Sequence, residues 1–123
     1  MKRILIVDDA ATVRLYHKGI LESAGYAVEE ALNGIEALEK ALQGSFDLYL
    51  VDVNMPKLDG YGFLQELRRQ DLPQAPAIMV STEAGPQDQV LAFRAGANGY
   101  LVKPIKPEQL LQHVRFMVGE PNP

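Results

Sequence analysis

Residues 48–60 read LYLVDVNMPKLDG, an apolar run followed by an acidic residue and a loop. Leu48–Val51 is short and continuously apolar, which is typical of a strand in a sheet that is covered on both faces. Asp52 follows it directly, and Asp59-Gly60-Tyr61-Gly62 is a turn signal at the entry to a helix. The stretch therefore predicts one strand–loop–helix unit of an α/β protein.

The same alternation runs along the rest of the chain. The other runs predicted as strands are Ile4–Val7, Ala27–Leu32, Ala77–Val80 and Tyr100–Val102. Glu29 and Glu30 interrupt the second of these runs, which favours an edge position for it. Because predicted strands and helices alternate, we expect a doubly wound, five-stranded parallel sheet with right-handed crossovers and helices on both faces.

Apolar residues recur at helical spacing between the predicted strands. The predicted buried stripes are Val13, Tyr16, Ile20 and Ala24; Ile35, Leu38 and Leu42; Phe63, Leu64 and Leu67; and Leu110, Leu111, Val114 and Met117. The fourth helix has a poor stripe, made of Val90, Leu91 and Phe93. Asn33 with Glu36 three residues later predicts a capped start for the second helix.

Length and composition indicate one globular domain and exclude several classes of protein. The chain has 123 residues, of which 47% are hydrophobic and 23% charged. It has no cysteine, which excludes a disulfide framework, a thiolate metal site and a cysteine nucleophile. A net charge of −4 provides no attraction for nucleic acid or an anionic membrane. Because no apolar stretch approaches the ~18 residues of a membrane span, we expect a cytoplasmic protein.

Charged and hydroxyl-bearing residues stand at the carboxyl ends of four predicted strands. They are Asp8, Asp9, Asp52, Ser81, Thr82 and Lys103. The carboxyl ends of parallel strands share one edge of the sheet, where open α/β sheets bind ligands. Three carboxylates placed together repel one another and shift toward protonation. A hard divalent cation held by oxygen relieves this repulsion, and Mg²⁺ suits a site that also accepts a phosphoryl oxygen.

The remaining groups at this edge suit phosphoryl chemistry. Lys103 supplies a positive charge for a phosphoryl oxygen, and Ser81 supplies a hydroxyl donor. Asp52 lies opposite that lysine, so its carboxylate can act as the nucleophile that forms an aspartyl phosphate. Taken singly, each residue also has a simpler interpretation: Asp9 as a helix N-cap, Asp52 as a solvated loop carboxylate and Lys103 as a surface lysine.

Four segments, in order and each at a strand end, carry a resemblance to a known family. They are IVDDAATVR (6–14), LVDVNMPKLDGYGF (50–63), AIMVSTEAG (77–85) and GANGYLVKPIKPEQL (96–110). Together they resemble the receiver domain of two-component response regulators over essentially the whole chain, with the greatest likeness to single-domain chemotaxis-type regulators. The resemblance implies a flavodoxin-like sheet with strand order 2-1-3-4-5 and five helices.

The resemblance also implies how the acidic residues act. Asp52 is the phosphoacceptor. Asp9, the Asp52 carboxylate and the backbone carbonyl of Asn54 bind Mg²⁺ directly, and Asp8 acts mainly through a coordinated water.

A second group of roles implied by the resemblance concerns the switch. Lys103 pairs with the phosphoryl group, and the Lys103–Pro104 peptide is expected to be cis. Ser81 is the switch hydroxyl, and Tyr100 is the aromatic residue that turns inward when Ser81 moves to the phosphate. Thr82 departs from the small residue usual at its place in the family. Its extra bulk would narrow access to the phosphoryl group and so affect the rate of hydrolysis.

Three residues have simpler structural interpretations. Tyr100 can be a packing residue of the last strand. His17 and His113 have no ligand-spaced partner, so we interpret both as boundary histidines and reject His17 as a phosphorelay histidine.

Two other function classes share this fold. A flavodoxin-like cofactor carrier needs a phosphate-binding loop rich in small residues after the first strand, where this chain has Asp8-Asp9. An aspartate-nucleophile phosphatase places its two acids two residues apart after that strand, which Asp8-Asp9-Ala10 does not. The site therefore favours the receiver interpretation.

The sequence prediction is a phosphorylation-switched signalling protein rather than an enzyme. Its expected partners are a sensor histidine kinase or histidine phosphotransferase and a downstream protein, which docks on the face formed by the fourth helix, fifth strand and fifth helix. We expect a monomer with a receiver domain over residues 1–119 and a loose tail over 120–123. The alternatives are a receiver excised from a transcriptional regulator or hybrid kinase, and a phosphorelay intermediate.

Overall fold

Five strands and five helices alternate in the structure, a computed structural model that describes residues 1–122. The strands are β1 (Arg3–Val7), β2 (Ala27–Ala31), β3 (Leu48–Asp52), β4 (Ala77–Ser81) and β5 (Gly99–Val102). The helices are α1 (Ala11–Ser23), α2 (Gly34–Gln43), α3 (Gly60–Arg69), α4 (Pro86–Ala95) and α5 (Pro107–Val118). Every strand and helix predicted from the sequence is therefore present.

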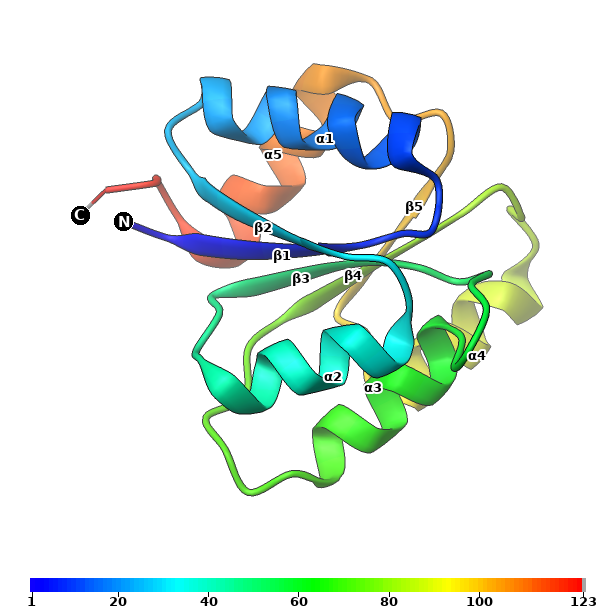
Figure 1. The fold of residues 1–123 in the computed structure, drawn as a ribbon. Coiled ribbons are helices and arrows are strands. Elements are labelled where there is room, and N and C mark those ends of the chain that lie inside the picture. Colours follow the sequence, from blue (N-terminus) through cyan, green and yellow to red (C-terminus); the bar gives the residue numbers. More distant parts are fainter. Residues whose placement is uncertain (123) are drawn as a thin grey trace.

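The strands form one parallel sheet with the order β2-β1-β3-β4-β5. Helices α1 and α5 cover one face of the sheet, and α2, α3 and α4 cover the other (Figure 1). This confirms the doubly wound, flavodoxin-like α/β fold and the edge position of β2. Segments near the two ends of the described chain lie close together (Figure 1), and the Lys2 N–H donates to the Pro121 carbonyl at 2.9 Å. The predicted division at residue 119 stays a prediction, and residue 123 lies outside the described residues.

Alternate residues of each central strand feed two separate cores. In β1, Ile4 and Ile6 belong to the core beneath α1 and α5, whereas Leu5 and Val7 belong to the core beneath α2, α3 and α4. Burial of one such side chain stabilises the fold by roughly 1.5–3 kcal/mol. The strands read as continuous apolar runs because both faces of the sheet are covered.

The predicted stripe of α3 is confirmed, since Phe63, Leu64 and Leu67 are all fully buried. In α5, Leu110 and Val114 are buried. The side chain of Asn33 accepts a hydrogen bond from the Glu36 N–H, which confirms the predicted cap of α2.

The predicted stripe of α2 is wrong at two of its three positions. Ile35 is 46% exposed and Leu42 is 56% exposed, and the buried positions of this helix are Gly34, Ala37 and Ala41. Small residues face inward because the helix starts against the β3–α3 loop. A Cβ atom on Gly34 would lie only 2.4 Å from the Leu58 carbonyl oxygen.

The stripe of α1 is also shifted from its predicted position. Tyr16 is 49% exposed, and the fully buried residues of the helix are His17 and Leu21. The interpretation of His17 as a boundary residue is therefore wrong, since its side chain is part of the buried face that α1 turns toward the sheet and α5.

No helix within residues 1–122 has the length and apolar character needed to cross a membrane.

Candidate functional site

The carboxyl edge of the sheet brings the predicted acidic residues together. Asp8 and Asp9 follow β1, and Asp52 is the last residue of β3. One carboxylate oxygen from each of the three lies within 4.8 Å of the others. Asp8 and Asp52 are buried, and Asp9 is exposed. Oxygen donors at this spacing are a suitable ligand set for a hard divalent cation.

Lys103, immediately after β5, reaches into this acidic cluster. Its Nζ lies 3.0 Å from Asp8 Oδ2 and 3.0 Å from Asp52 Oδ1. Its own backbone N–H donates to the Ser81 carbonyl at 2.8 Å, which fixes the loop against the end of β4. The Lys103–Pro104 peptide is cis, as expected. One ammonium group thus bridges two of the three carboxylates.

The local electrostatics leave the cluster short of positive charge. Burial raises the pKa of the Asp52 carboxyl above its ordinary value, and Asp8 and Asp9 raise it further, against the opposing hydrogen bond from Lys103. Burial tends to lower the pKa of Lys103, but its hydrogen bonds to Asp52 and Asp8 and their charges outweigh this effect and raise it. Lys103 therefore stays protonated, and the charged form of Asp52 is disfavoured because its negative charge is incompletely compensated.

The backbone of the β1–α1 turn orients Asp8. The Ala10 N–H donates to Asp8 Oδ1 at 2.9 Å, and the other carboxylate oxygen, Oδ2, accepts from Lys103 Nζ. The N-cap position of α1 is Ala10, without a side-chain hydrogen bond. Asp9 therefore does not cap α1, and its exposed carboxylate faces the cluster instead.

The β3–α3 loop packs tightly against the end of β3. The Gly60 N–H donates to the Val53 carbonyl at 2.9 Å, and a Cβ atom on Gly60 would lie 2.4 Å from the Asp52 carbonyl oxygen. Only glycine fits this close approach. Asp59 caps α3 by accepting from the Gly62 N–H at 2.8 Å. Asn54, the predicted carbonyl ligand, lies exposed at the start of this loop.

Ser81 and Tyr100 meet at one residue of the β4–α4 loop. Ser81 Oγ accepts from the Glu83 N–H at 3.0 Å, and the Tyr100 hydroxyl donates to the Glu83 carbonyl at 2.7 Å. Ser81 is buried at the end of β4, beside the cluster, and Tyr100 is half-buried in β5. The sequence interpretation identified both residues but not Glu83 as their shared contact, because a backbone contact leaves no signal in residue type.

His17 lies near this site and was missed as a site residue. Burial lowers the pKa of its imidazole, with an opposing effect from Asp8 and a further lowering by Lys103. The spacing of Val13, His17 and Leu21 along one helix face was the available signal. His113 is half-buried on α5, where its Nδ1 lies 2.9 Å from the Gln109 carbonyl oxygen.

Comparison with known proteins identifies relatives of the chain. The family model of the response regulator receiver domain matches residues 4–115. The chain is 36% identical to the chemotaxis protein CheY1 of Helicobacter pylori, with 95% of this chain and 97% of that protein covered. It is 35% identical to the transcriptional regulatory protein ResD of Bacillus subtilis, with 94% of this chain and 48% of that protein covered. The chain spans about half the length of most of the curated relatives it matches.

Solved structures agree with these matches over nearly the whole chain. The chemotaxis protein CheY4 of Vibrio cholerae is 39% identical, with a TM-score of 0.90 and coverage of 95% of this chain and 98% of that one. The receiver domain of the sensor histidine kinase PA1611 from Pseudomonas aeruginosa is 32% identical, with a TM-score of 0.89 and coverage of 97% and 98%. The latter structure contains a magnesium ion coordinated in the active site cleft.

Proposed function

Since the chain belongs to the family of response regulator receiver domains, we propose that Asp52 accepts a phosphoryl group from the phosphohistidine of a sensor histidine kinase or histidine phosphotransferase. As a receiver domain, the chain is a signalling phosphoacceptor rather than a true enzyme. An oxygen of Asp52 attacks phosphorus, the P–N bond breaks, and the electron pair stays on the donor imidazole, which takes up a proton. The product is an acyl phosphate on Asp52.

One observation carries this proposal: Lys103 binds Asp52 through a single oxygen, inside an acidic cluster. Lys103 Nζ lies 3.0 Å from Asp52 Oδ1, whereas Asp52 Oδ2 takes no hydrogen bond from any residue between 1 and 122. The free oxygen is the proposed nucleophile. The lysine, which already lies beside it, would then pair with an oxygen of the transferred phosphoryl group.

We further propose that the acidic cluster holds Mg²⁺, as the site of the PA1611 receiver does. The donors would be Asp9, Asp52 and the backbone carbonyl of Asn54, with Asp8 acting through water. When bound, the cation offsets the negative charge of the carboxylates and of the phosphoryl oxygens. The donor chemistry fits, because all three side chains offer carboxylate oxygens within one ion's reach.

Ser81 and Tyr100 are the proposed switch residues. Phosphorylation adds about −1.5 to −2 charges at the end of β3, which draws the Ser81 hydroxyl as a hydrogen-bond donor. Ser81 accepts from the Glu83 N–H, and Tyr100 donates to the Glu83 carbonyl. Movement of Ser81 would therefore displace Glu83 and disturb the hydrogen bond of Tyr100. The inward turn of Tyr100 would reshape the face made by α4, β5 and α5.

The proposed output is the docking of a downstream protein on that face. Helix α4 exposes three large apolar side chains that a partner can cover: Val90, Leu91 and Phe93, which are 47%, 50% and 49% exposed. The acidic net charge of −4 favours a protein over DNA as the direct target. We place this monomeric signalling module in the cytoplasm, where its kinase would present the phosphohistidine.

The lengths of the relatives favour a second candidate. Several matched relatives of about twice the length are transcriptional regulators, and PA1611 is a sensor histidine kinase. The same site would then serve as the receiver of a larger regulator or hybrid kinase, or as an intermediate of a phosphorelay.

The experiment is phosphorylation with acetyl phosphate and Mg²⁺, followed by intact-mass analysis and peptide mapping. Wild type should gain one base-labile phosphoryl group on Asp52, and Asp52→Asn should gain none there. Asp71→Asn, at an exposed loop position, is the matched control and should behave as wild type. Normal labelling of Asp52→Asn would remove Asp52 as the acceptor.

A further inference from the structure

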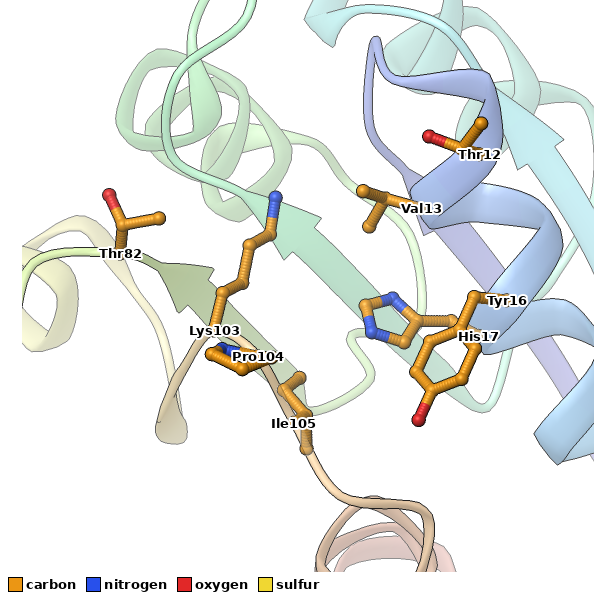
Figure 2. Close-up of a pocket in the computed structure, with 8 residues that line it drawn as sticks. All are labelled: Thr12, Val13, Tyr16, His17, Thr82, Lys103, Pro104 and Ile105. Atoms are coloured by element: carbon orange, nitrogen blue, oxygen red, sulfur yellow. The ribbon is translucent and has the colours of Figure 1, made fainter.

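A pocket of about 380 Å³ lies between α1 and the loop after β5 (Figure 2). Helix α1 contributes Val13, Tyr16 and His17 to its lining, and the loop contributes Lys103, Pro104 and Ile105. Its volume falls within the range of small-molecule sites, which are mostly apolar and carry a few placed polar groups.

His17 is the polar group that enters this pocket from α1. Its side chain points from α1 into the space beside Lys103, Pro104 and Ile105 (Figure 2), although the residue as a whole is only 3% exposed. Tyr16, on the same helix, places its ring 5.6 Å from the imidazole, centroid to centroid. The pocket thus has apolar walls and one deeply set imidazole.

The imidazole of His17 has no hydrogen-bond partner among residues 1–122. Every fully buried side-chain nitrogen or oxygen in that part of the chain does have a partner. The ring nitrogens of His17 must therefore open onto the pocket, since they would otherwise stand as buried and unpaired. An imidazole that presents its nitrogens to an otherwise apolar pocket is the kind of placed polar group that orients a ligand.

We propose that this pocket binds a small aromatic molecule that carries one neutral hydrogen-bonding group, such as a phenolic hydroxyl. The ring would lie among Tyr16, Pro104 and Ile105, and the hydroxyl would hydrogen-bond to His17. The proposed head group is neutral because the two charged residues nearest the pocket, Lys103 and Asp8, already pair with each other at 3.0 Å.

The pocket shares a wall with the phosphoacceptor site. Lys103 and Thr82 line it (Figure 2), and the same lysine binds Asp52 at 3.0 Å. A bound molecule would therefore crowd the approach to Asp52 and slow phosphorylation. This consequence rests on the proposed function, whereas the binding itself does not, so the two are measured separately.

The test compares phenol with toluene, which have nearly the same shape but differ in the hydroxyl. The binding of each to ¹⁵N-labelled wild type is followed by NMR, at the amides of α1 and the β5–α5 loop and at the His17 ring nitrogens. We expect phenol to bind roughly two- to tenfold more tightly than toluene, the effect of one neutral hydrogen bond. In these separate titrations, phenol should shift the His17 ring nitrogen resonances and toluene should not.

Variants separate the hydrogen bond from general apolar binding. His17→Leu should lose the preference for phenol, because the hydroxyl would then be buried without a partner, and His17→Gln should restore part of that preference. His113→Leu removes the other histidine, which lies outside the pocket, and should keep the wild-type preference.

Four results would overturn the proposal: equal binding of the two probes to wild type, a phenol preference that survives in His17→Leu, shifts centred outside this pocket, or no binding of phenol at tens of millimolar. The wild-type ring resonances decide the question even where His17→Leu does not fold. Inhibition of acetyl phosphate labelling by phenol is a separate readout, and its absence would count against the crowding consequence alone.

Discussion

Ser81 and Tyr100, on neighbouring strands, bind the two backbone groups of one residue, Glu83. Ser81 Oγ accepts from the Glu83 N–H at 3.0 Å, and the Tyr100 hydroxyl donates to its carbonyl at 2.7 Å. Strands β4 and β5 pair directly, so a displacement of Ser81 has a short route to Tyr100 through a single loop residue.

This relationship predicts how a phosphoryl mimic spreads its effect. Beryllofluoride bound at Asp52 should draw Ser81 and shift the amide resonances of Ser81, Glu83, Tyr100 and α4. In Tyr100→Phe the ring stays but the hydrogen bond to Glu83 is lost, so the α4 shifts should shrink while those at Asp52 persist. Shifts confined to the acidic cluster in wild type would mean that this face is not the output.

Removal of Asp9 should weaken metal binding more than removal of any other single side chain. Asp9 is the exposed member of the cluster, and Lys103 leaves it free by binding Asp8 and Asp52. Mg²⁺ titration monitored by NMR should show weak binding in wild type and much weaker binding in Asp9→Ala, with phosphorylation reduced in parallel. Lys103→Ala, which removes a positive charge, serves as the comparison and should retain Mg²⁺ binding. Unchanged affinity in Asp9→Ala would rule out Asp9 as a ligand.

The chelation of Mg²⁺ should abolish labelling by acetyl phosphate. Without the cation, the carboxylates repel both one another and the incoming phosphoryl oxygens. The measurement is labelling with EDTA present, followed by restoration with excess Mg²⁺. Full labelling in EDTA would remove the proposed metal from the reaction.

Asp52→Asn should stabilise the metal-free fold, because burial and the neighbouring Asp8 raise the pKa of Asp52 and make its charged form unfavourable. We expect a gain of roughly 1–2 kcal/mol in the free energy of unfolding at pH 7, the usual cost of a poorly compensated buried group. A raised carboxyl pKa means that the folded state takes up the proton first as pH falls. The extra stability of Asp52→Asn over wild type should therefore decrease as the pH falls from neutral toward 3.8, the ordinary pKa of this carboxyl in the unfolded chain. Urea unfolding across this range measures it, and a destabilised variant at pH 7 would contradict the charge argument.

Thr82→Ala should shorten the lifetime of the phosphoryl group. The Thr82 side chain is exposed at the end of β4, next to Lys103 (Figure 2), where its bulk narrows the approach of water. We expect dephosphorylation to accelerate roughly two- to fivefold, a barrier change of about 1 kcal/mol or less. The decay of ³²P-labelled protein gives the rate, and a slower variant would contradict the crowding explanation.

The amino-acid sequence was sufficient to predict the sheet and the residues of the acidic cluster. Buried parallel strands read as continuous apolar runs, and their carboxyl ends meet at one edge whatever the details of packing. Strand order alone therefore places Asp8, Asp52 and Lys103 together. Each lies at or next to the last residue of its strand.

In α1 and α2, packing against neighbouring elements selected a buried face that the apolar pattern had misplaced. In α2, a periodic pattern of large apolar residues suggested Ile35 and Leu42, yet the helix turns Gly34 and Ala37 inward. Helical periodicity restricts the buried face only to within about one residue, and the fit to neighbouring elements selects among the remaining rotations. The same rotation in α1 buries His17 and leaves Tyr16 exposed, which creates the pocket beside Lys103. These features depend on contacts between segments far apart in the chain, and local periodicity narrows the choice of buried face without completing it.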